Sequence, residues 1–336
     1  MNYSHPLDEK IRSPQRCDIK RSFSVWTDLL GFGRNFSESD WSPPIEIWKA
    51  QAKRAADAYR IQCQNVHVSM NGEGHMLLLN DGMIRTLIWT PEQQIIQLGL
   101  WLRAAVFSHS QIFESERSRD LPGPRSIISA GWIAEHSFDE VKVDDLVFNY
   151  TRSKPGLSKI ATTTGNPVLV SNPSQLQLNT GFSRAFLLDE AGSRAGLSGP
   201  SMYIDKAFLD AVVEICDKQE GVQVNDWIRK DDRVFCVEFT GNSKSVLKEN
   251  DLLTLADWDN LQPEIERRIS KGEEAFPSRN QPLAFGFLLE KDEISVDLPN
   301  LKTKAYRVMG YYPNDEDPSG FMIELANRSF TNGPKS

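Results

Sequence analysis

The sequence predicts an α+β fold in which helices cover an antiparallel sheet. Three consecutive patterns carry this prediction: a β-type apolar run that ends at Asp28, a helix-type stretch from Ser39 to Arg60, and an apolar hairpin pattern at residues 75–89. A strand, a helix and a hairpin in this order, with a further helix and strand after them, favour antiparallel neighbours in the sheet. A doubly wound parallel sheet is the main competing architecture.

The first strand and the loop after it lie in residues 25–35, VWTDLLGFGRN. The β-branched and aromatic run predicts a buried strand with Asp28 at its C-terminal end. Gly31 and Gly33 allow backbone N–H groups to point into a tight loop before the next helix, an arrangement that favours phosphate. The Asp28 carboxylate favours a hard divalent cation. The alternative is that Asp28 serves only the turn.

The hairpin pattern, HMLLLNDGMIRTLIW, joins two apolar runs through Asn80-Asp81-Gly82. An Asp-Gly turn between β-type runs is a strong hairpin signal, and on its own it gives Asp81 a role in the turn only. Paired with Asp28, the same carboxylate suggests a second interpretation. The two side chains would hold two metal ions roughly 4 Å apart, which suits in-line phosphoryl chemistry.

The remaining elements follow from apolar periodicity, caps and breakers. They are a short strand at Val66–Ser69, a helix from Thr90-Pro91, a strand at Arg125–Gly131, a helix at 179–192, a strand at Ser201–Asp205, a helix from Lys206 to about Lys218, and strands at Val234–Phe239, Leu283–Leu289 and Ala305–Tyr312. This order predicts a sheet of ferredoxin-like type. We expect a loose tail at 1–20, a main domain at 21–245 with an insertion at about 137–178, and a C-terminal α/β extension at 246–336.

The strand–carboxylate–GF loop, the helix and the carboxylate-tipped hairpin resemble the class III nucleotide cyclase catalytic domain. The resemblance is closest to the bacterial branch with a D-L-L-G-F opening, which includes the pyrimidine cyclases of the Pycsar anti-phage systems. Downstream segments extend it over residues 21–245. They are RSIISAG at 125–131, FSRAFLLD at 182–189, similar to the family pattern V-N-x-A-x-R-L-E, and SMYID at 201–205.

The resemblance implies a function and a set of site residues. Asp28, Asp81 and the backbone of Leu29 would bind two Mg²⁺ or Mn²⁺ ions, and a nucleoside triphosphate would be converted to a cyclic nucleotide and pyrophosphate, in anti-phage signalling for the pyrimidine branch. Sites of this class form between two subunits, so a homodimer is implied. The loop backbone would contact phosphate oxygens through Leu29, Leu30, Gly31, Phe32 and Gly33.

Three positions depart from the purine cyclases. Ser183 and Leu187 replace the family Asn and the Arg that steadies the transition state, and Leu77 replaces the base-selecting Lys of adenylate cyclases. Three interpretations remain open: a different base, with a pyrimidine preferred; a substitute catalytic cation, Arg125 or Arg184; or no turnover. In the last case the domain would be a catalytically inert nucleotide sensor or a dimerising interaction module.

Composition limits the alternatives. A net charge of −8 and a pI of about 5.3 argue against an extended nucleic-acid surface. No apolar run approaches the ~18 residues of a membrane span, and the first residues lack the apolar core of a signal peptide. The cysteines and histidines form no zinc or redox motif, which fits a reducing cytosol, so we expect a cytoplasmic protein. The four cysteines are Cys17, Cys63, Cys216 and Cys236.

Overall fold

The computed structural model describes residues 17–69, 76–136, 157–160, 168–171, 178–228, 232–239, 283–312 and 323–324. The predicted N-terminal tail up to residue 16 and most of the predicted insertion lie outside these residues. Two strands of the insertion are described, β5 (Leu157–Ile160) and β6 (Val168–Ser171), and they form a separate antiparallel pair.

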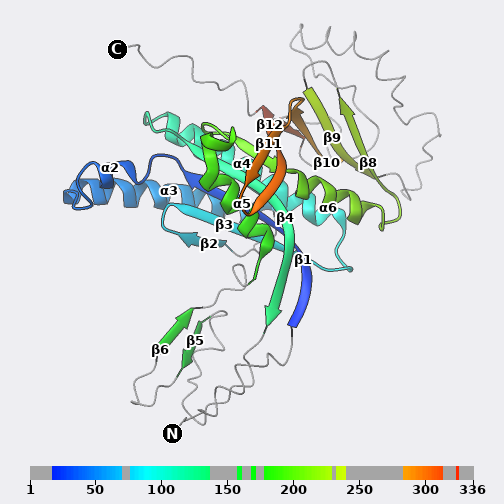
Figure 1. Cartoon of the computed structure of the whole chain (residues 1–336), viewed down its shortest axis with the longest axis horizontal. Helices are drawn as coiled ribbons and strands as arrows, with labels where there is room; N and C mark the ends of the chain where they lie inside the picture. Colours follow the sequence, from blue (N-terminus) through cyan, green and yellow to red (C-terminus); the bar gives the residue numbers. More distant parts are fainter. Residues whose placement is uncertain are drawn as a thin grey trace.

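The other described strands form an 11-stranded sheet (Figure 1). Nine of them follow the order β2-β3-β1-β4-β7-β12-β10-β9-β8, and β11 and β13 pair with β12. Every pairing is antiparallel except that of β4 with β7. The strands are β1 (Cys17–Leu29), β2 (Met76–Leu79), β3 (Gly82–Trp89), β4 (Pro124–His136), β7 (Met202–Asp205), β8 (Val222–Ile228), β9 (Asp232–Phe239), β10 (Leu283–Glu290), β11 (Ile294–Leu298), β12 (Leu301–Tyr312) and β13 (Ile323–Glu324). The α+β prediction is confirmed, with a large mixed sheet.

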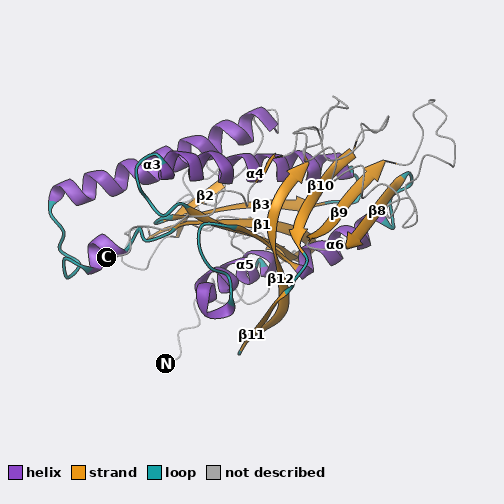
Figure 2. Ribbon diagram, turned by 90° about the horizontal axis from the view of Figure 1, so that it is seen from above, coloured by secondary structure: helices purple, strands orange, loops and turns teal. Residues whose placement is uncertain are grey.

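Helices cover both faces of the sheet, as the view in Figure 2 shows. The helices are α2 (Arg34–Ser37), α3 (Ile45–Ser69), α4 (Ile95–Arg117), α5 (Thr180–Ala191) and α6 (Lys206–Cys216), with a 3₁₀ turn, η2 (Gly192–Ala195), after α5. α4 and α6 share one apolar core with Phe23 and Val25, whereas α5 packs in a second core with Trp26. Since successive strand residues point to opposite faces, Asp28 lies on the same face as Trp26 and α5.

Several boundaries differ from the sequence predictions. The residues predicted as a strand at Val66–Ser69 instead form the last turn of α3, and this helix begins at Ile45 rather than Ser39. Pro43 and Pro44 explain the later start, because the residue before a proline is disfavoured in helical conformation. Likewise α4 begins at Ile95, where Gln94 and Gln97 form a reciprocal capping box.

The C-terminal segment joins the main sheet. β12 pairs with β7 on one side and with β10 on the other, and β10 pairs with β9. The boundary placed at residue 245 stays a prediction, but strands from both sides of it belong to one sheet. Phe285, Phe287 and Tyr311 of this segment are fully buried in the core shared with α4 and α6.

No helix in the described part of the chain is long and apolar enough to cross a membrane.

Candidate functional site

The register of the sheet brings Asp28 and Asp81 together. Asp28 of β1 pairs with Gly82 of β3 on one side and with Arg125 of β4 on the other. Asp81 directly precedes Gly82, in a turn where Asn80 adopts a φ of 60°. The two loop residues are Asn80 and Asp81, and a positive φ at the first of them alone is typical of a type II′ hairpin turn. The hairpin therefore delivers the second carboxylate to the strand end that carries the first.

The space beside these carboxylates is filled by Trp26. A Cβ atom added at Gly82 would lie 2.0 Å from Trp26 Cη2, so only glycine fits under the indole ring. The indole Nε1 donates to Asp189 Oδ2 at 3.0 Å, and the ring packs edge-on against Phe186. Trp26 therefore connects the hairpin turn to helix α5.

Asp189 is a third carboxylate of the site, and its role was not predicted from the sequence. Arg125 Nε donates to Asp189 Oδ1 at 2.5 Å, and Arg125 Nη2 donates to the Asp189 backbone oxygen at 2.7 Å. The signal was present, because Asp189 falls on the final acidic position of the V-N-x-A-x-R-L-E pattern. The structure thus places Arg125 beside Asp28 but commits its guanidinium to Asp189.

Close backbone contact fixes the position of α5, and with it that of Asp189. The Asn179 side chain caps the helix by accepting from the Phe182 N–H at 3.0 Å, and it also accepts from Ser22 Oγ of β1 at 3.0 Å. A Cβ atom at Gly131 would lie 2.4 Å from the backbone nitrogen of Gly181, so this pair of glycines lets the helix start against β4.

Burial and neighbouring charges shift the two central carboxyl groups. Burial raises the pKa of Asp28 to about 7, and the negative charges of Asp189 and Asp81 act in the same direction. The positive charges of Arg125 and Arg54 oppose this shift. Burial also raises the pKa of Asp81. A carboxyl pair with raised pKa values gains most from a nearby divalent cation, which favours the ionised forms of both groups.

A buried ion pair holds the loop that follows Asp28. Arg54 of α3 donates from Nε to both carboxylate oxygens of Glu116 of α4, at 3.0 and 2.8 Å, and from Nη2 to the Leu30 backbone oxygen at 2.9 Å. Both side chains are at most 3% exposed. The roles of Arg54 and Glu116 were not predicted. Each is an ordinary charged residue in its own helix, and the local sequence does not indicate that the two helices meet beside the Leu30 loop.

The predicted phosphate loop differs in part from the expectation. It leads into α2, which has only four residues and begins after Gly33 as its N-cap, and not directly into the long helix α3. The Leu30 N–H donates to the Gly123 oxygen and the Phe32 N–H to the Leu29 oxygen. In the described chain this leaves Gly31 and Gly33 as the loop residues whose N–H groups have no backbone acceptor.

Arg184 lies apart from the carboxylate pair. Its Nε and Nη2 donate to the two carboxylate oxygens of Asp205, at 2.7 and 3.0 Å, and it is not among the charges that shift the Asp28 pKa. Ser183 donates to the Asn179 backbone oxygen within α5, and Leu77 packs against the apolar core around Trp26.

The donor set fits one divalent cation better than two. Asp28 and Asp81 form no ion pair with any described residue, whereas Asp189 is neutralised by Arg125. Among the described residues, no group of three or more His, Cys, Asp or Glu side chains is arranged to hold a metal ion. The Leu29 oxygen, which accepts from the Phe32 N–H at 3.2 Å, has a second lone pair available. A second ion would need oxygen ligands from a bound nucleotide.

No family model matches the chain, and no curated protein matches it. Among solved structures it is similar to the adenylyl cyclase CyaB from P. aeruginosa, with 8% identity over 87% of this chain and 95% of that chain and a TM-score of 0.39. It is similar to the guanylyl cyclase Cya2, with 14% identity over 68% of this chain and 97% of that chain and a TM-score of 0.34. A third similar structure is the guanylate cyclase domain of RhGC from Catenaria anguillulae in complex with GTP, with 9% identity over 63% of this chain and 90% of that chain and a TM-score of 0.31. Identities and scores this low assign no activity to the chain.

The raised pKa of Asp28 predicts a pH-dependent stability. The pKa of Asp28 is about 7 in the folded protein, compared with an ordinary value of 3.8. Between pH 4 and pH 7 the folded state therefore binds more protons than the unfolded state. The free energy of unfolding should fall as the pH rises through this range. In EDTA, the free energy of unfolding of an Asp28→Asn variant, relative to that of the wild type, should therefore be about 3–4 kcal/mol higher at pH 8 than at pH 4. Urea unfolding at both pH values measures this, with the exposed Asp120→Asn as the control. A gain that is the same at both pH values would contradict the assigned environment.

Proposed function

We propose that the protein is a metal-dependent nucleotide cyclase that converts a nucleoside triphosphate into a 3′,5′-cyclic nucleotide and pyrophosphate. The proposal rests on the position of the Asp28 and Asp81 carboxylates next to each other at one strand end. Neither carboxylate forms an ion pair with a described Lys, Arg or His side chain. Two carboxylates without a neutralising side chain are a natural ligand set for Mg²⁺ or Mn²⁺.

The reaction balances without any further reagent. The ribose 3′-oxygen attacks the α-phosphorus, the bond from that phosphorus to the bridging oxygen breaks, and pyrophosphate leaves while the hydroxyl proton passes to solvent. A bound divalent cation would supply the charge stabilisation and the lowered pKa of the attacking hydroxyl. Asp28 and Asp81 would hold that cation, and the amides of Gly31 and Gly33 would donate to phosphate oxygens.

The base preferred by this site is a pyrimidine. Leu77 lies four residues before Asp81, the position that the resemblance aligns with the base-selecting Lys of adenylate cyclases, and its side chain packs in the apolar core around Trp26. A leucine cannot hydrogen-bond the edge of a purine, so the site lacks the contact by which it would select one. UTP or CTP is therefore the proposed substrate. A role of the product in anti-phage signalling is proposed on the sequence resemblance alone.

A homodimer is part of the same proposal. Leu78 of β2 and Phe186 of α5 expose 45% and 40% of their surface, although both are large and apolar. Phe186 packs on Trp26, next to the hairpin that carries Asp81, so a second subunit would cover apolar surface beside the site.

The engagement of both candidate arginines favours a second function, a nucleotide sensor without turnover. Arg125 is held by Asp189 and Arg184 by Asp205, so neither is placed to neutralise charge developing on a reacting phosphate. Contacts to the ground state without contacts to the transition state allow binding but little catalysis.

Turnover separates these two functions. We expect the protein with Mn²⁺ to convert UTP or CTP to a cyclic product identified by mass spectrometry, faster than ATP or GTP. Asp28→Asn and Asp81→Asn should each lower the rate by about 100-fold or more, and Asp120→Asn should not. Metal-dependent nucleotide binding with no cyclic product would favour the sensor. A product that persists when Asp28 and Asp81 are both replaced would mean that the site is elsewhere.

A further inference from the structure

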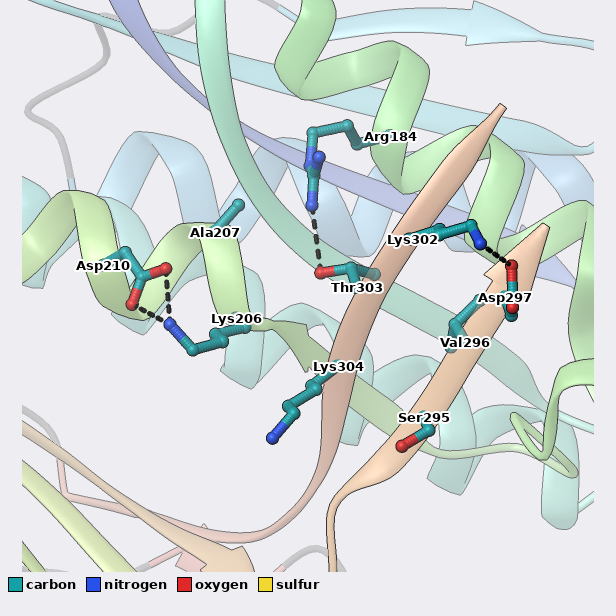
Figure 3. A pocket seen from close by; sticks show the side chains of 10 residues that line it. All are labelled: Arg184, Lys206, Ala207, Asp210, Ser295, Val296, Asp297, Lys302, Thr303 and Lys304. Atoms are coloured by element: carbon teal, nitrogen blue, oxygen red, sulfur yellow. Dashed lines mark hydrogen bonds and ion pairs between the residues drawn. The ribbon is translucent and has the colours of Figure 1, made fainter. Parts of the chain in front are cut away.

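A cavity of about 580 Å³ lies between the start of α6 and the β11–β12 hairpin, on the side of α5 that carries Arg184 (Figure 3). Its volume is in the range of small-molecule sites. The chain as a whole carries a net charge of −8, but the cavity is lined by more cationic than acidic side chains. The cationic ones are Arg184, Lys206, Lys302 and Lys304.

Arg184 is fixed in place at this cavity. Its guanidinium donates to both oxygens of Asp205. Its Nη2 also donates to Thr303 Oγ1 at 3.0 Å (Figure 3). Nη1 has no acceptor among the described residues. A planar guanidinium that is held on one edge is preorganised for an anion on the other.

The carboxylate beneath the cavity is already satisfied. Asp205 is fully buried and also accepts hydrogen bonds from Thr303 Oγ1 at 2.6 Å, from Ser129 Oγ at 2.6 Å and from the Ala207 N–H at 3.2 Å. Its charge is therefore spread over several donors and does not repel an anion as an uncompensated carboxylate would. The N-terminus of α6 begins at the same place, with Lys206 and Ala207 in the lining, and Asp205 is its N-cap.

Among the described residues, each of the three lysines forms an ion pair with an exposed carboxylate. Lys206 pairs with Asp210, Lys302 with Asp297 and Lys304 with Glu293. The side chains of these pairs are between 40% and 78% exposed. Exposed ion pairs contribute little free energy, so each lysine can turn from its partner to a ligand at small cost.

We propose that this cavity binds the phosphoryl group of a small soluble phosphorylated molecule. Arg184 and Thr303 form its fixed floor, and Lys206 lies beside it at the start of α6. Lys302 and Lys304 alternate with Thr303 along β12 and so line the rim, from which their side chains would turn to the anion. The site is separate from the carboxylate pair at Asp28 and needs no divalent cation.

Calorimetric titration of the full chain with inorganic pyrophosphate in EDTA tests the proposal, because the chelator removes any metal-dependent binding at Asp28 and Asp81. We expect saturable binding at one site per chain. The double variant Lys302→Glu/Lys304→Glu should raise the Kd by about tenfold or more, equivalent to about 1.4 kcal/mol. Both lysines lie on β12 with exposed side chains, so the variant is expected to fold, which its unfolding curve will show.

The matched control is Lys49→Glu/Lys53→Glu, which makes the same change of charge on the exposed side of α3. It should leave the Kd within about twofold of the wild-type value, since distant surface charges are screened at physiological salt. Equal weakening by the two double variants would show a general charge effect and overturn the proposal. Failure of the wild type to bind pyrophosphate saturably would also overturn it, whatever the result of the cyclase assay.

Discussion

Replacing Gly82 with alanine should destabilise the protein severely. The new methyl group would lie 2.0 Å from Cη2 and 2.2 Å from Cζ2 of Trp26, whose ring is only 4% exposed and cannot move aside. Overpacking of a buried site typically costs about 1–3 kcal/mol, and a rigid ring held by Asp189 places this case at the upper end. The free energy of unfolding from urea denaturation measures the loss.

Two further variants make this prediction specific. Gly33→Ala adds the same methyl group in the neighbouring loop, where no atom lies within 4 Å, and should change stability by less than about 0.5 kcal/mol. Trp26→Phe removes the outer ring that the methyl group would meet. The double variant Trp26→Phe/Gly82→Ala should therefore be more stable than the sum of its single variants predicts, by about 1 kcal/mol or more. Strict additivity would show that the indole ring does not cover Gly82.

The local parts of the site were predictable from the sequence. Each of these parts is encoded by a local pattern about ten residues long. They are strand β1, the β2–β3 hairpin and the capped helix α5. Once β1 and the β2–β3 hairpin are neighbours, the register places Asp81 beside Asp28. The prediction of their juxtaposition therefore needed only one long-range assumption, that β1 and β3 pair.

The parts that sequence reasoning missed depend on long-range contacts. Asp189 reaches the site because Gly131 and Gly181 let α5 approach β4, and a period-2 pattern in a strand indicates which face is buried but not which helix covers it. Glu116 and Arg54 meet across two helices, and each is an ordinary charged residue in its own helix. For the same reason the order of the strands in the sheet was not predictable, since apolar alternation within a strand does not reveal which strands pair.

The second large effect concerns the carboxylate pair itself. If Asp28 and Asp81 hold the cation that binds the triphosphate, then removing both charges removes the metal ligands and leaves the fold intact. Because burial raises the pKa of both groups, their neutral replacement also relieves the cost of keeping two charges there. Loss of stability should therefore not accompany loss of binding, which distinguishes a metal site from a structural role for the pair.

Calorimetric titration with UTP in the presence of Ca²⁺, which supports binding but poor chemistry, tests this claim most directly. We expect wild-type protein and the Asp120→Asn variant to bind UTP only when the divalent cation is present. The Asp28→Asn/Asp81→Asn variant should remain folded, with a Kd for UTP raised by about 100-fold or more, as expected when direct metal ligands are lost. Unchanged cation-dependent binding by that double variant, or UTP binding by the wild type that is the same in EDTA, would contradict the account.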